Sequence, residues 1–561
     1  MKYYEYIINI LNAFGIKRVF AYPGEQIKPL YDGLCSSDID LVMARRESGC
    51  GHMADGYGRI LNYFGVALAT AGPGATNLMT PIATAYKDSS SLICITGRCN
   101  REYIGKNYFQ EIKHDFLNVY KGYLLLGNKE DKFLNGICES IYSRKPVHFN
   151  IPSDVLYSNK DNNFENFNIE PGNFKDIKYI RDGLKYLETL NTDVIIDNLK
   201  KLRDKKGVLL LGQGIYGLLS YWEMLKLNDI LKNSPLPIIT TYPVRGAINE
   251  YEEISLGLCG RRGTVLGNNA LLNSDYIISI GASLSYNTIP KSIRDKVIKK
   301  IIPIEKHIYS LEDVRTIIEY LNQIGLKPYD NTNNNSSIKI NNIKINKNNN
   351  TNNSNNNFNS NSNNNINNNI NNFNKTDFNK TNDNQTILNN DYPSKIREIL
   401  NTFPENGIVI TDAGNHTVFT SLLKKCIVPK NIISSHSMGT MGFGLPAGIG
   451  VKFACMDYNI DREVMVISGD GGFQMSLEEL GVVSDYNLKI LIIIMKNNHL
   501  NMFGKIKNPD FNKIGDAYNI NNEYITKTEE IRNSIKNHLK GNKPTLLVIE
   551  CDNDKIPKPF L

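Results

Sequence analysis

Short hydrophobic runs alternate with amphipathic stretches along most of this chain, and many of the runs end in Gly, Asp or Asn. The runs before the middle of the chain are KRVFAYP, FGVALATAG, SLICITG, PVHFNIP, KGVLLLGQG, PLPIITTYP and DYIISIGAS, and those in the last third are NGIVITDAG, EVMVISGDGG, LKILIIIMKN and PTLLVIE. Buried parallel strands that lead into helices have this pattern. It predicts an α/β chain with doubly wound, mostly parallel sheets.

Two breaks in the pattern divide the chain into three predicted domains. Residues 154–185 show little apolar periodicity, and residues 331–390 are rich in asparagine. An Asn-rich tract cannot bury enough apolar area to offset the entropy lost on ordering, so we predict a disordered linker; a prion-like interaction tract is the alternative. The predicted divisions are domains at residues 1–160, 185–325 and 391–561, with the linker at 326–390.

Neither the N-terminus nor the longest apolar run predicts a membrane segment. The stretch MKYYEYIINILNAFGIKRVF carries charges within its apolar pattern, which is typical of an amphipathic helix leading into a strand and not of a signal peptide. The run ILIIIM from Ile490 is far shorter than the ~20 residues of a membrane helix and fits a buried parallel strand. We expect a cytoplasmic protein that does not enter a membrane.

Composition narrows the function classes. The chain has 561 residues, 41% of them hydrophobic, and a formal net charge of only +7, with lysines scattered among acids. This charge pattern argues against a nucleic-acid surface. The nine cysteines show no Cys-x-x-Cys pair, so neither a disulfide framework nor a zinc site is indicated. The chain therefore has the composition of a multidomain enzyme.

Candidate chemistry lies at the ends of two strands in the last domain. Asp470 follows the strand in VISGDGGFQM, and Asn497 follows the strand in LKILIIIMKNNHL. Ligands of open α/β sheets bind at the carboxyl ends of the strands. If the two strands are neighbours, the side chains converge, and the helix expected after the Gly-Asp-Gly-Gly turn brings free N–H groups toward an anion. Two oxygen ligands beside such a helix describe a magnesium ion that also binds phosphate oxygens.

These motifs resemble those of thiamine-diphosphate enzymes, and most closely the acetolactate synthase large, catalytic subunit. A Gly469-Asp470-Gly471 turn alone is also an ordinary turn, but Asn497 follows at the spacing of the family's diphosphate-binding motif. The segments ARRESGCGHMADGYGR, ATAGPGATNLMTPIATAYKDSSSLICITG, YFQE, YPGEQIKPLYDGL and GTMGFGLPAGIG match the same family in order. The resemblance covers nearly the whole chain outside the Asn-rich tract.

The resemblance implies a catalytic role for Glu47. In this family a buried glutamate bonds to N1′ of the cofactor's aminopyrimidine and favours the tautomer that takes the proton from C2. A carboxylate with raised proton affinity suits this exchange. The alternative for Glu47, taken alone, is an exposed ion pair with Arg45 or Arg46 at the start of a helix.

Other matching positions are expected to hold the cofactor, the metal and the substrate. Met441 matches the bulky residue that wedges between the two cofactor rings, although methionine is also common in protein cores. Asp470, Asn497 and the backbone carbonyl of His499 match the metal ligands, with Asn498 as the runner-up because relatives carry their asparagine pair one position earlier. The remaining expected cofactor contacts are Gly72, Pro73, Gly74, Asn77, Gly414, Asn415, His416, Gly469, Gly471 and Gly472, and the expected substrate contacts are Phe109 and Gln110.

The resemblance also implies an assembly and a reaction. Because Glu47 and Asp470 come from different chains in the family, we expect a homodimer or a dimer of dimers, and a small regulatory subunit is a further implied partner. The implied reaction decarboxylates pyruvate and joins the fragment to a second 2-oxo acid, in branched-chain amino-acid biosynthesis, with thiamine diphosphate and Mg²⁺ as cofactors.

The sequence departs from the family in its middle. Acetolactate synthases carry an Arg-Phe-Asp-Asp-Arg run where this chain has SLSYNTIPKS after Gly281-Ala282, and the tryptophan usual after the second metal ligand is missing. The departure speaks against the FAD that the resemblance implies for the central domain. It also leaves two alternatives: a related decarboxylase or lyase acting on another 2-oxo acid or an acyl-thioester, and a cofactor-binding regulator without catalysis.

Overall fold

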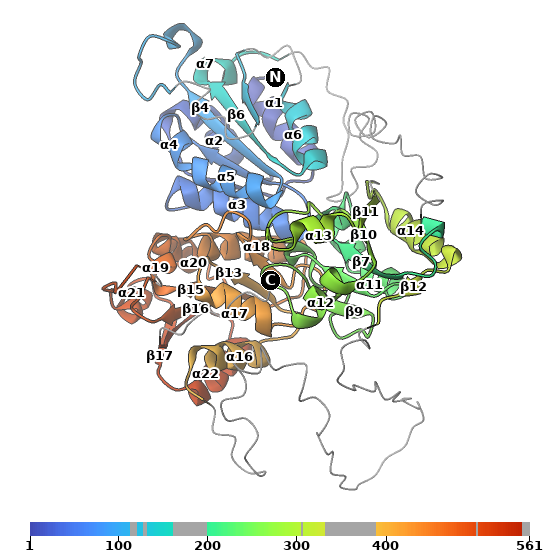
Figure 1. Ribbon diagram of the computed structural model, residues 1–561. Coiled ribbons are helices and arrows are strands. Elements are labelled where there is room, and N and C mark those ends of the chain that lie inside the picture. Colours follow the sequence, from blue (N-terminus) through green and yellow to red (C-terminus); the bar gives the residue numbers. More distant parts are fainter. Residues whose placement is uncertain are drawn as a thin grey trace, which may run out of the picture.

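The computed structural model describes residues 1–112, 121–126, 132–160, 199–304, 307–330, 389–500 and 503–552. Within these residues the strands form three separate sheets, each of six parallel strands, flanked by helices (Figure 1). This confirms the predicted α/β class with three parallel-sheet units. The Asn-rich segment predicted to be disordered lies almost entirely at residues 331–388, outside the described part of the chain.

The first sheet has the strand order β2-β1-β3-β4-β6-β5. Its strands are β1 (Arg18–Ala21), β2 (Asp40–Met43), β3 (Gly65–Ala69), β4 (Leu92–Arg98), β5 (Lys121–Leu124) and β6 (Pro146–Pro152). Its helices are α1 (Tyr3–Ala13), α2 (Lys28–Cys35), α3 (Glu47–Leu61), α4 (Pro73–Asn77), α5 (Met79–Asp88), α6 (Lys132–Ser143) and α7 (Ser153–Leu156). The amphipathic helix predicted at the N-terminus is confirmed as α1, which buries Tyr3, Ile7 and Leu11.

The central sheet has the order β11-β10-β7-β8-β9, and β12 pairs with β7. Its strands are β7 (Lys206–Leu211), β8 (Ile238–Thr240), β9 (Ser255–Leu258), β10 (Tyr276–Ile280), β11 (Ile301–Ile304) and β12 (Lys327–Pro328). Its helices are α10 (Tyr221–Met224), α11 (Leu227–Leu231), α12 (Val265–Asn273), α13 (Arg294–Ile298) and α14 (Leu311–Ile324). Because β12 joins this sheet, the central unit continues slightly past the boundary predicted at residue 325.

The third sheet has the order β14-β13-β15-β16-β18-β17. Its strands are β13 (Ile408–Thr411), β14 (Ile432–Ser434), β15 (Val464–Gly469), β16 (Leu491–Lys496), β17 (Asn521–Ile525) and β18 (Thr545–Glu550). Its helices are α16 (Tyr392–Thr402), α17 (Asn415–Leu423), α18 (Gly444–Asp457), α19 (Asp470–Phe473), α20 (Leu480–Asp485), α21 (Phe511–Ala517) and α22 (Thr528–Lys540). The run ILIIIM, predicted to be a buried parallel strand, is buried throughout, and all of it after Ile490 lies in β16.

One expectation for this sheet is wrong. The helix expected to run on from the Gly-Asp-Gly-Gly turn is broken into α19, a short 3-10 turn at Leu477–Glu479, and α20. Gln474, between α19 and the turn, bonds through its side chain to the carbonyl of Asp470 and to Asn508. The turn therefore leads into several short pieces, and the first of them begins at Asp470 itself.

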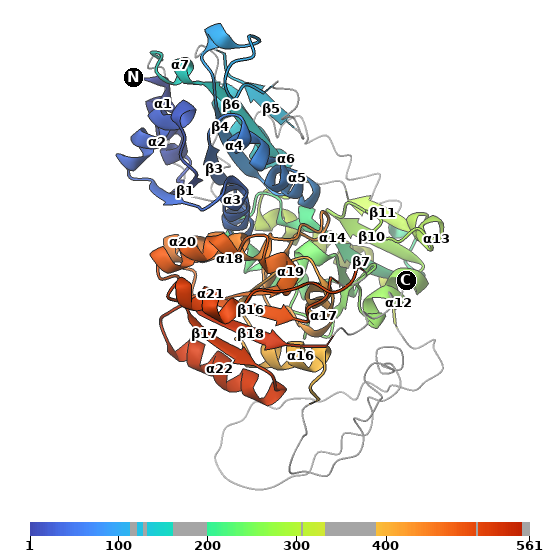
Figure 2. The same cartoon turned by 90° about the vertical axis from the view of Figure 1, so that its left-hand side faces the viewer.

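The first and third units meet where α3 packs on α18 (Figure 2). Both helices present glycine at this contact. A Cβ at Gly56 would lie 2.2 Å from the carbonyl oxygen of Ala447, and one at Gly450 would lie 1.9 Å from that of Met53. Glycine lets the two backbones approach more closely than side chains would allow. This contact fixes the start of α3 next to the loops of the third sheet.

No helix in the described part of the chain is long and apolar enough to cross a membrane. All nine cysteines are described, and all are free thiols.

Candidate active site

The strands that carry Asp470 and Asn497 are neighbours. β15 and β16 pair in parallel, with Gly469 opposite Met495, so both strands end at the same edge of the sheet. This confirms the premise on which the predicted metal site depends. The sequence motif and the fold agree that these two turns converge.

The carboxylate of Asp470 is buried at the centre of this edge. One of its oxygens accepts the backbone N–H of Asn498 at 2.7 Å and the side-chain amide of Asn508 at 2.7 Å. The other accepts the N–H of Gly471 at 2.8 Å. The amide of Asn508 also donates to the side-chain oxygen of Asn498 at 2.8 Å. Asp470 thus holds the turn after β16 by hydrogen bonds. It also binds Asn508, which the sequence pattern does not single out.

The side chain of Asn497 folds over its own turn. Its oxygen accepts the N–H of His499 at 3.0 Å, while Asn498 has a positive φ of 54° and accepts from Asn508. Asn498 is linked to Asp470 through its own N–H and through Asn508, whereas the Asn497 oxygen bonds within its own turn. The choice between the two as metal ligand stays a prediction.

The donor set fits a hard cation. Among the described residues no group of three or more His, Cys, Asp or Glu side chains is placed to hold a metal. One carboxylate with amide and backbone oxygens is a set that suits Mg²⁺ completed by phosphate oxygens and water. A magnesium-bound diphosphate therefore matches the chemistry at Asp470.

Glu47 is the first residue of α3, and its carboxylate lies beside the turn that begins α4. One oxygen accepts the side-chain amide of Asn77 at 2.9 Å, and the other would be 3.6 Å from a Cβ at Gly74. The side chain is half-buried. The exposed ion pair with Arg45 or Arg46 considered for Glu47 is not formed: Arg45 pairs with Asp485 instead. The structure brings Glu47 together with Asn77 and Gly74, as the resemblance implies.

Met441 reaches the same region from the third unit. A cavity of about 180 Å³ between the first and third units is lined by Met441 and Met475 on one side and by Asn77, Ser48 and Thr76 on the other. Met441 is 38% exposed, which is more than a core methionine would be. Met441 therefore lines a cavity shared by the two units, and its role as a wedge stays a prediction.

Asp412 holds the loop that carries Met441. This fully buried carboxylate, just after β13, accepts the N–H of Gly442 at 3.0 Å and the hydroxyl of Ser468 at 3.0 Å. Burial raises its pKa to about 6, although the backbone N–H groups that it accepts oppose the shift. A Cβ at Gly472 would lie 2.7 Å from its oxygen, so glycine is required there. Asp412 ties the Met441 loop to the strand that ends in Asp470.

Gly414, Asn415 and His416 lie at the start of α17, next to the Gly469 turn. The His416 ring is buried, and its Nε2 lies 2.8 Å from the carbonyl of Asp412. A Cβ at Gly414 would be 2.6 Å from that ring, and one at Gly469 would be 3.5 Å from it. Burial lowers the pKa of His416 to about 4, so it is neutral at pH 7. Gly414 and Gly469 therefore both lie close to the His416 ring, at the ends of the neighbouring strands β13 and β15.

The predicted substrate residues lie on the loop that follows β4. Gln110 has a positive φ of 60° and packs closely on Gly72. A Cβ added at Gly72 would lie 2.7 Å from the Cβ of Gln110. Phe109 is 71% exposed. Pro73 begins α4, which ends at Asn77. The glycine loop is therefore in contact with Gln110, and the role of Phe109 stays a prediction.

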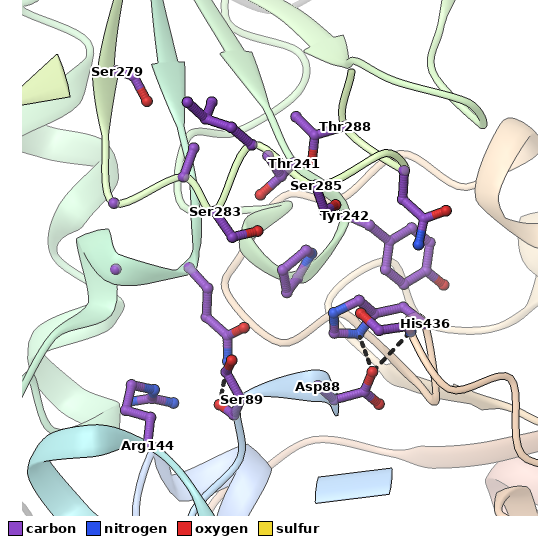
Figure 3. A pocket seen from close by; sticks show the side chains of 18 of the residues that line it. Asp88, Ser89, Arg144, Thr241, Tyr242, Ser279, Ser283, Ser285, Thr288 and His436 are labelled. Carbon is purple, nitrogen blue, oxygen red and sulfur yellow. Dashed lines mark hydrogen bonds and ion pairs between the residues drawn. The ribbon is translucent and has the colours of Figure 1, made fainter. Parts of the chain in front are cut away.

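A second, larger cavity of about 720 Å³ lies at the carboxyl ends of the central strands (Figure 3). The loop after β10 lines it with Ser283, Ser285 and Thr288, and Arg144 reaches it from the first unit. The Arg144 Nη1 donates to the carbonyl of Gly217 at 3.1 Å, and its buried Nε has no partner in the described chain. Burial lowers the pKa of Arg144 to about 10. Arg261 and Arg262 line the cavity as well, so its chemistry suits an anionic ligand, while the loop after β10 presents hydroxyl groups where the resemblance implies arginines.

Comparison with known protein families agrees with this geometry. The model of the N-terminal TPP binding domain of thiamine pyrophosphate enzymes matches residues 1–119, and that of the C-terminal TPP binding domain matches residues 412–549. The chain belongs to the thiamine pyrophosphate enzyme family. The two matched regions hold Glu47 and Asp470, respectively, which are the residues that face the cofactor in our interpretation.

Individual relatives of this thiamine pyrophosphate enzyme span nearly its whole length. It is 46% identical over 565 residues to an uncharacterized protein of Methanocaldococcus jannaschii, covering 100% of this chain and 99% of the relative. It is 29% identical to a probable acetolactate synthase large subunit of the same organism, covering 98% and 92%. It is 24% identical to the acetolactate synthase isozyme 2 large subunit of Escherichia coli, covering 98% and 95%.

Proposed function

We propose that this thiamine pyrophosphate enzyme uses thiamine diphosphate and Mg²⁺ to decarboxylate a 2-oxo acid, pyruvate, and to join the fragment to a second 2-oxo acid. Relatives named acetolactate synthase large subunit support this reaction class. The resemblance further implies a step in branched-chain amino-acid biosynthesis. The single observation that carries the proposal is the shared cavity: Asn77, the partner of Glu47, and Met441 line it from two units of the fold.

The chain's own residues divide the work. When bound, thiamine diphosphate supplies the electron sink for the decarboxylation. Asp470, with Asn497 or Asn498 and the carbonyl of His499, would hold Mg²⁺ and through it the diphosphate. Met441 would support the bent cofactor between its rings.

Glu47 would hold and exchange a proton with the pyrimidine of the cofactor. Its bond to Asn77 fixes one carboxylate oxygen and leaves the other free for that exchange. General acid–base groups held in this way accelerate proton transfer by about 10²- to 10⁴-fold.

A carboligation assay tests the reaction. The purified enzyme with thiamine diphosphate and Mg²⁺ is given pyruvate, with or without 2-oxobutyrate, and the acidified products are assayed for acetoin. Acetoin from pyruvate is the expected result. A complete lack of carboligation product with active, cofactor-loaded enzyme would refute the pyruvate assignment.

A second candidate is a related decarboxylase or lyase that acts on another 2-oxo acid or on an acyl-thioester. The observation that favours it is the loop after β10, which lines the central cavity with Ser283, Ser285 and Thr288 where acetolactate synthases carry arginines. A screen of 2-oxo acids and acyl-thioesters for CO₂ release distinguishes it from the first candidate. Release from one of these and not from pyruvate would favour the second. A non-catalytic regulator would release none.

The FAD implied for the central domain is tested by the colour of the purified protein. We expect a colourless enzyme, because the loop after β10 carries Ser283, Ser285 and Thr288 in place of the family's arginines, although Arg144, Arg261 and Arg262 line the same cavity. A yellow protein that releases FAD on denaturation would show that the cavity takes the whole dinucleotide.

We propose a homodimer, or a dimer of dimers, with a small regulatory subunit as a further candidate partner. The resemblance implies that each site takes Glu47 from one chain and Asp470 from another, whereas the cavity described above joins Asn77 and Met441 of one chain. The two arrangements predict different results when inactive variants are mixed. Mixing an inactive Glu47→Gln variant with an inactive Asp470→Ala variant tests the arrangement. If sites form between chains, exchange of subunits creates some sites with both native residues, and activity returns. If both residues of a site come from one chain, the mixture stays inactive.

A further inference from the structure

The helix that begins with Glu47 has no cap from its own segment. Arg46 is the N-cap residue of α3, and its side chain makes no capping hydrogen bond. The first N–H groups of a helix have no partner within the helix and are stabilised by an acceptor from elsewhere. The partner that the structure supplies comes from a distant part of the chain.

Glu479 provides it. Its carboxylate accepts the N–H of Arg45 at 3.0 Å with one oxygen and the N–H of Arg46 at 3.1 Å with the other. Its side chain is buried, and it arrives from the 3-10 turn of the third unit. A negative charge at this end of a helix is also favoured by the helix dipole.

The Glu479 carboxylate also packs closely against the first turn of α3. A Cβ at Gly49, in the first turn of α3, would lie 1.8 Å from a carboxylate oxygen of Glu479. The two amides held by Glu479 directly precede Glu47, whose own carboxylate has one described side-chain partner, Asn77. A shift of the Arg45–Arg46 backbone therefore moves Glu47 directly.

We propose that Glu479 is a positioning residue for Glu47: it sets where α3 begins, and so where the Glu47 carboxylate lies beside Asn77, which lines the cavity shared with Met441. The inference rests on the proposed function, since it assigns a purpose to the placement of Glu47. Besides Asp470, the third unit thus supplies a second carboxylate, that of Glu479, on which the alignment of the site depends.

The charge on Glu479 is sensitive near neutral pH. Burial raises its pKa to about 7; the N–H groups of Arg45 and Arg46 lower it, and neighbouring Glu478 raises it. Other ionisable groups around it are Glu47, the Arg45 guanidinium and His52, which lines the same cavity and whose pKa burial lowers to about 3. His52 stays neutral, and the charge on Glu479 changes between pH 6 and 8. The ionised carboxylate is the better acceptor for two N–H groups.

The test uses the Glu479→Gln variant of the full-length enzyme loaded with thiamine diphosphate and Mg²⁺. Hydrogen–deuterium exchange at C2 of the bound cofactor reports how well Glu47 is placed, because a misplacement of about 1 Å costs on the order of 10²-fold in such steps. We expect exchange to fall by about 10- to 100-fold while the cofactor Kd changes less than about 3-fold. The rise of the wild-type exchange rate through pH 7 should be absent in the variant.

A matched control is Glu223→Gln. Glu223 also accepts a backbone N–H at a helix start, that of Ser220 at 2.9 Å, but in the central unit and away from both cavities. It should leave exchange and its pH dependence unchanged. If Glu479→Gln does not fold, Glu479→Asp takes its place, because the shorter side chain keeps the charge but cannot reach both amides.

Backbone amide exchange separates this inference from the proposed function. In the wild type the Arg45 and Arg46 amides should be protected, and in Glu479→Gln they should exchange at least about 10-fold faster. That result supports the anchoring even if the wild type does no thiamine chemistry, in which case the proposed function alone fails. Unchanged amide protection, unchanged C2 exchange, or loss of cofactor binding in parallel with exchange would each overturn the positioning role.

Discussion

Gly450 offers a test in which two physical effects predict opposite signs. Replacing a glycine inside a helix by alanine favours the helix by about 1 kcal/mol. At Gly450, however, the new Cβ would lie 1.9 Å from the carbonyl oxygen of Met53 in α3, well inside the 3.4 Å at which ordinary van der Waals contact begins. The obstacle is backbone and cannot rotate away, so α18 and α3 must separate.

Overpacking of this kind costs typically 1–3 kcal/mol and occasionally more. Because the shortfall at Gly450 is large, we take the upper part of that range, and the helix gain of about 1 kcal/mol leaves a net loss of about 2 kcal/mol. For a unit of this size that corresponds to a fall in Tm of about 4–8 °C. The separation would also widen the cavity between Asn77 and Met441, so cofactor affinity should fall as well.

The assay is thermal unfolding followed by circular dichroism, with and without thiamine diphosphate and Mg²⁺. Gly515→Ala is the control, since its Cβ would lie 3.0 Å from the side-chain amide of Asn522, which can move. Gly515→Ala should change Tm by no more than about 2 °C. A Gly450→Ala enzyme that is as stable as the wild type, or more stable, would refute the close α3–α18 packing.

Further predictions concern the metal and the pH dependence of stability. Asp470→Ala should lose Mg²⁺-dependent retention of the cofactor, measured as cofactor content after gel filtration; full retention would contradict its role as ligand. Asn497→Ala and Asn498→Ala, compared in a Mg²⁺ titration, should differ by at least about 10-fold in apparent metal affinity, with the weaker binder marking the ligand; equal affinities would exclude a single asparagine ligand. Burial raises the pKa of Glu479 to about 7 from an ordinary 4.5, so its neutral form favours the folded state. The stabilisation of the folded state by neutral Glu479 is complete below pH 4.5 and is lost as the pH rises to about 7. The free energy of unfolding should fall by about 3 kcal/mol over this window. Wild-type stability should therefore fall across this window relative to that of Glu479→Gln, measured by urea unfolding, and parallel curves for the two proteins would contradict it.

Strong periodic signals made the fold largely predictable. Every strand expected from a run of consecutive apolar residues is present, from Arg18–Ala21 to Thr545–Glu550. The strands without such a signal are short or lie at sheet edges, such as β2 and β17, where half or more of the residues are exposed. Their pairing depends on the neighbouring strand and not on their own pattern.

The candidate site was predictable where glycine, acid and amide residues sit at strand ends, as at Asp470 and Asn497. Asp412 follows its strand in the same way, so that signal was present. Asn508 and Glu479 had no such signal: Asn508 lies in a loop after β16, and Glu479 acts on a helix more than 430 positions earlier in the chain. Contacts between segments so far apart are set by the packing of α3 on α18, which local patterns do not encode.

The central claim is that residues of the first and third units act on one thiamine diphosphate, with Glu47 as its proton-exchanging group. The most direct measurement is the rate of C2 hydrogen–deuterium exchange on the bound cofactor in the wild type and in Glu47→Gln. We predict that the variant still binds the cofactor and exchanges about 10²- to 10⁴-fold more slowly. Exchange at the wild-type rate in Glu47→Gln would contradict the account.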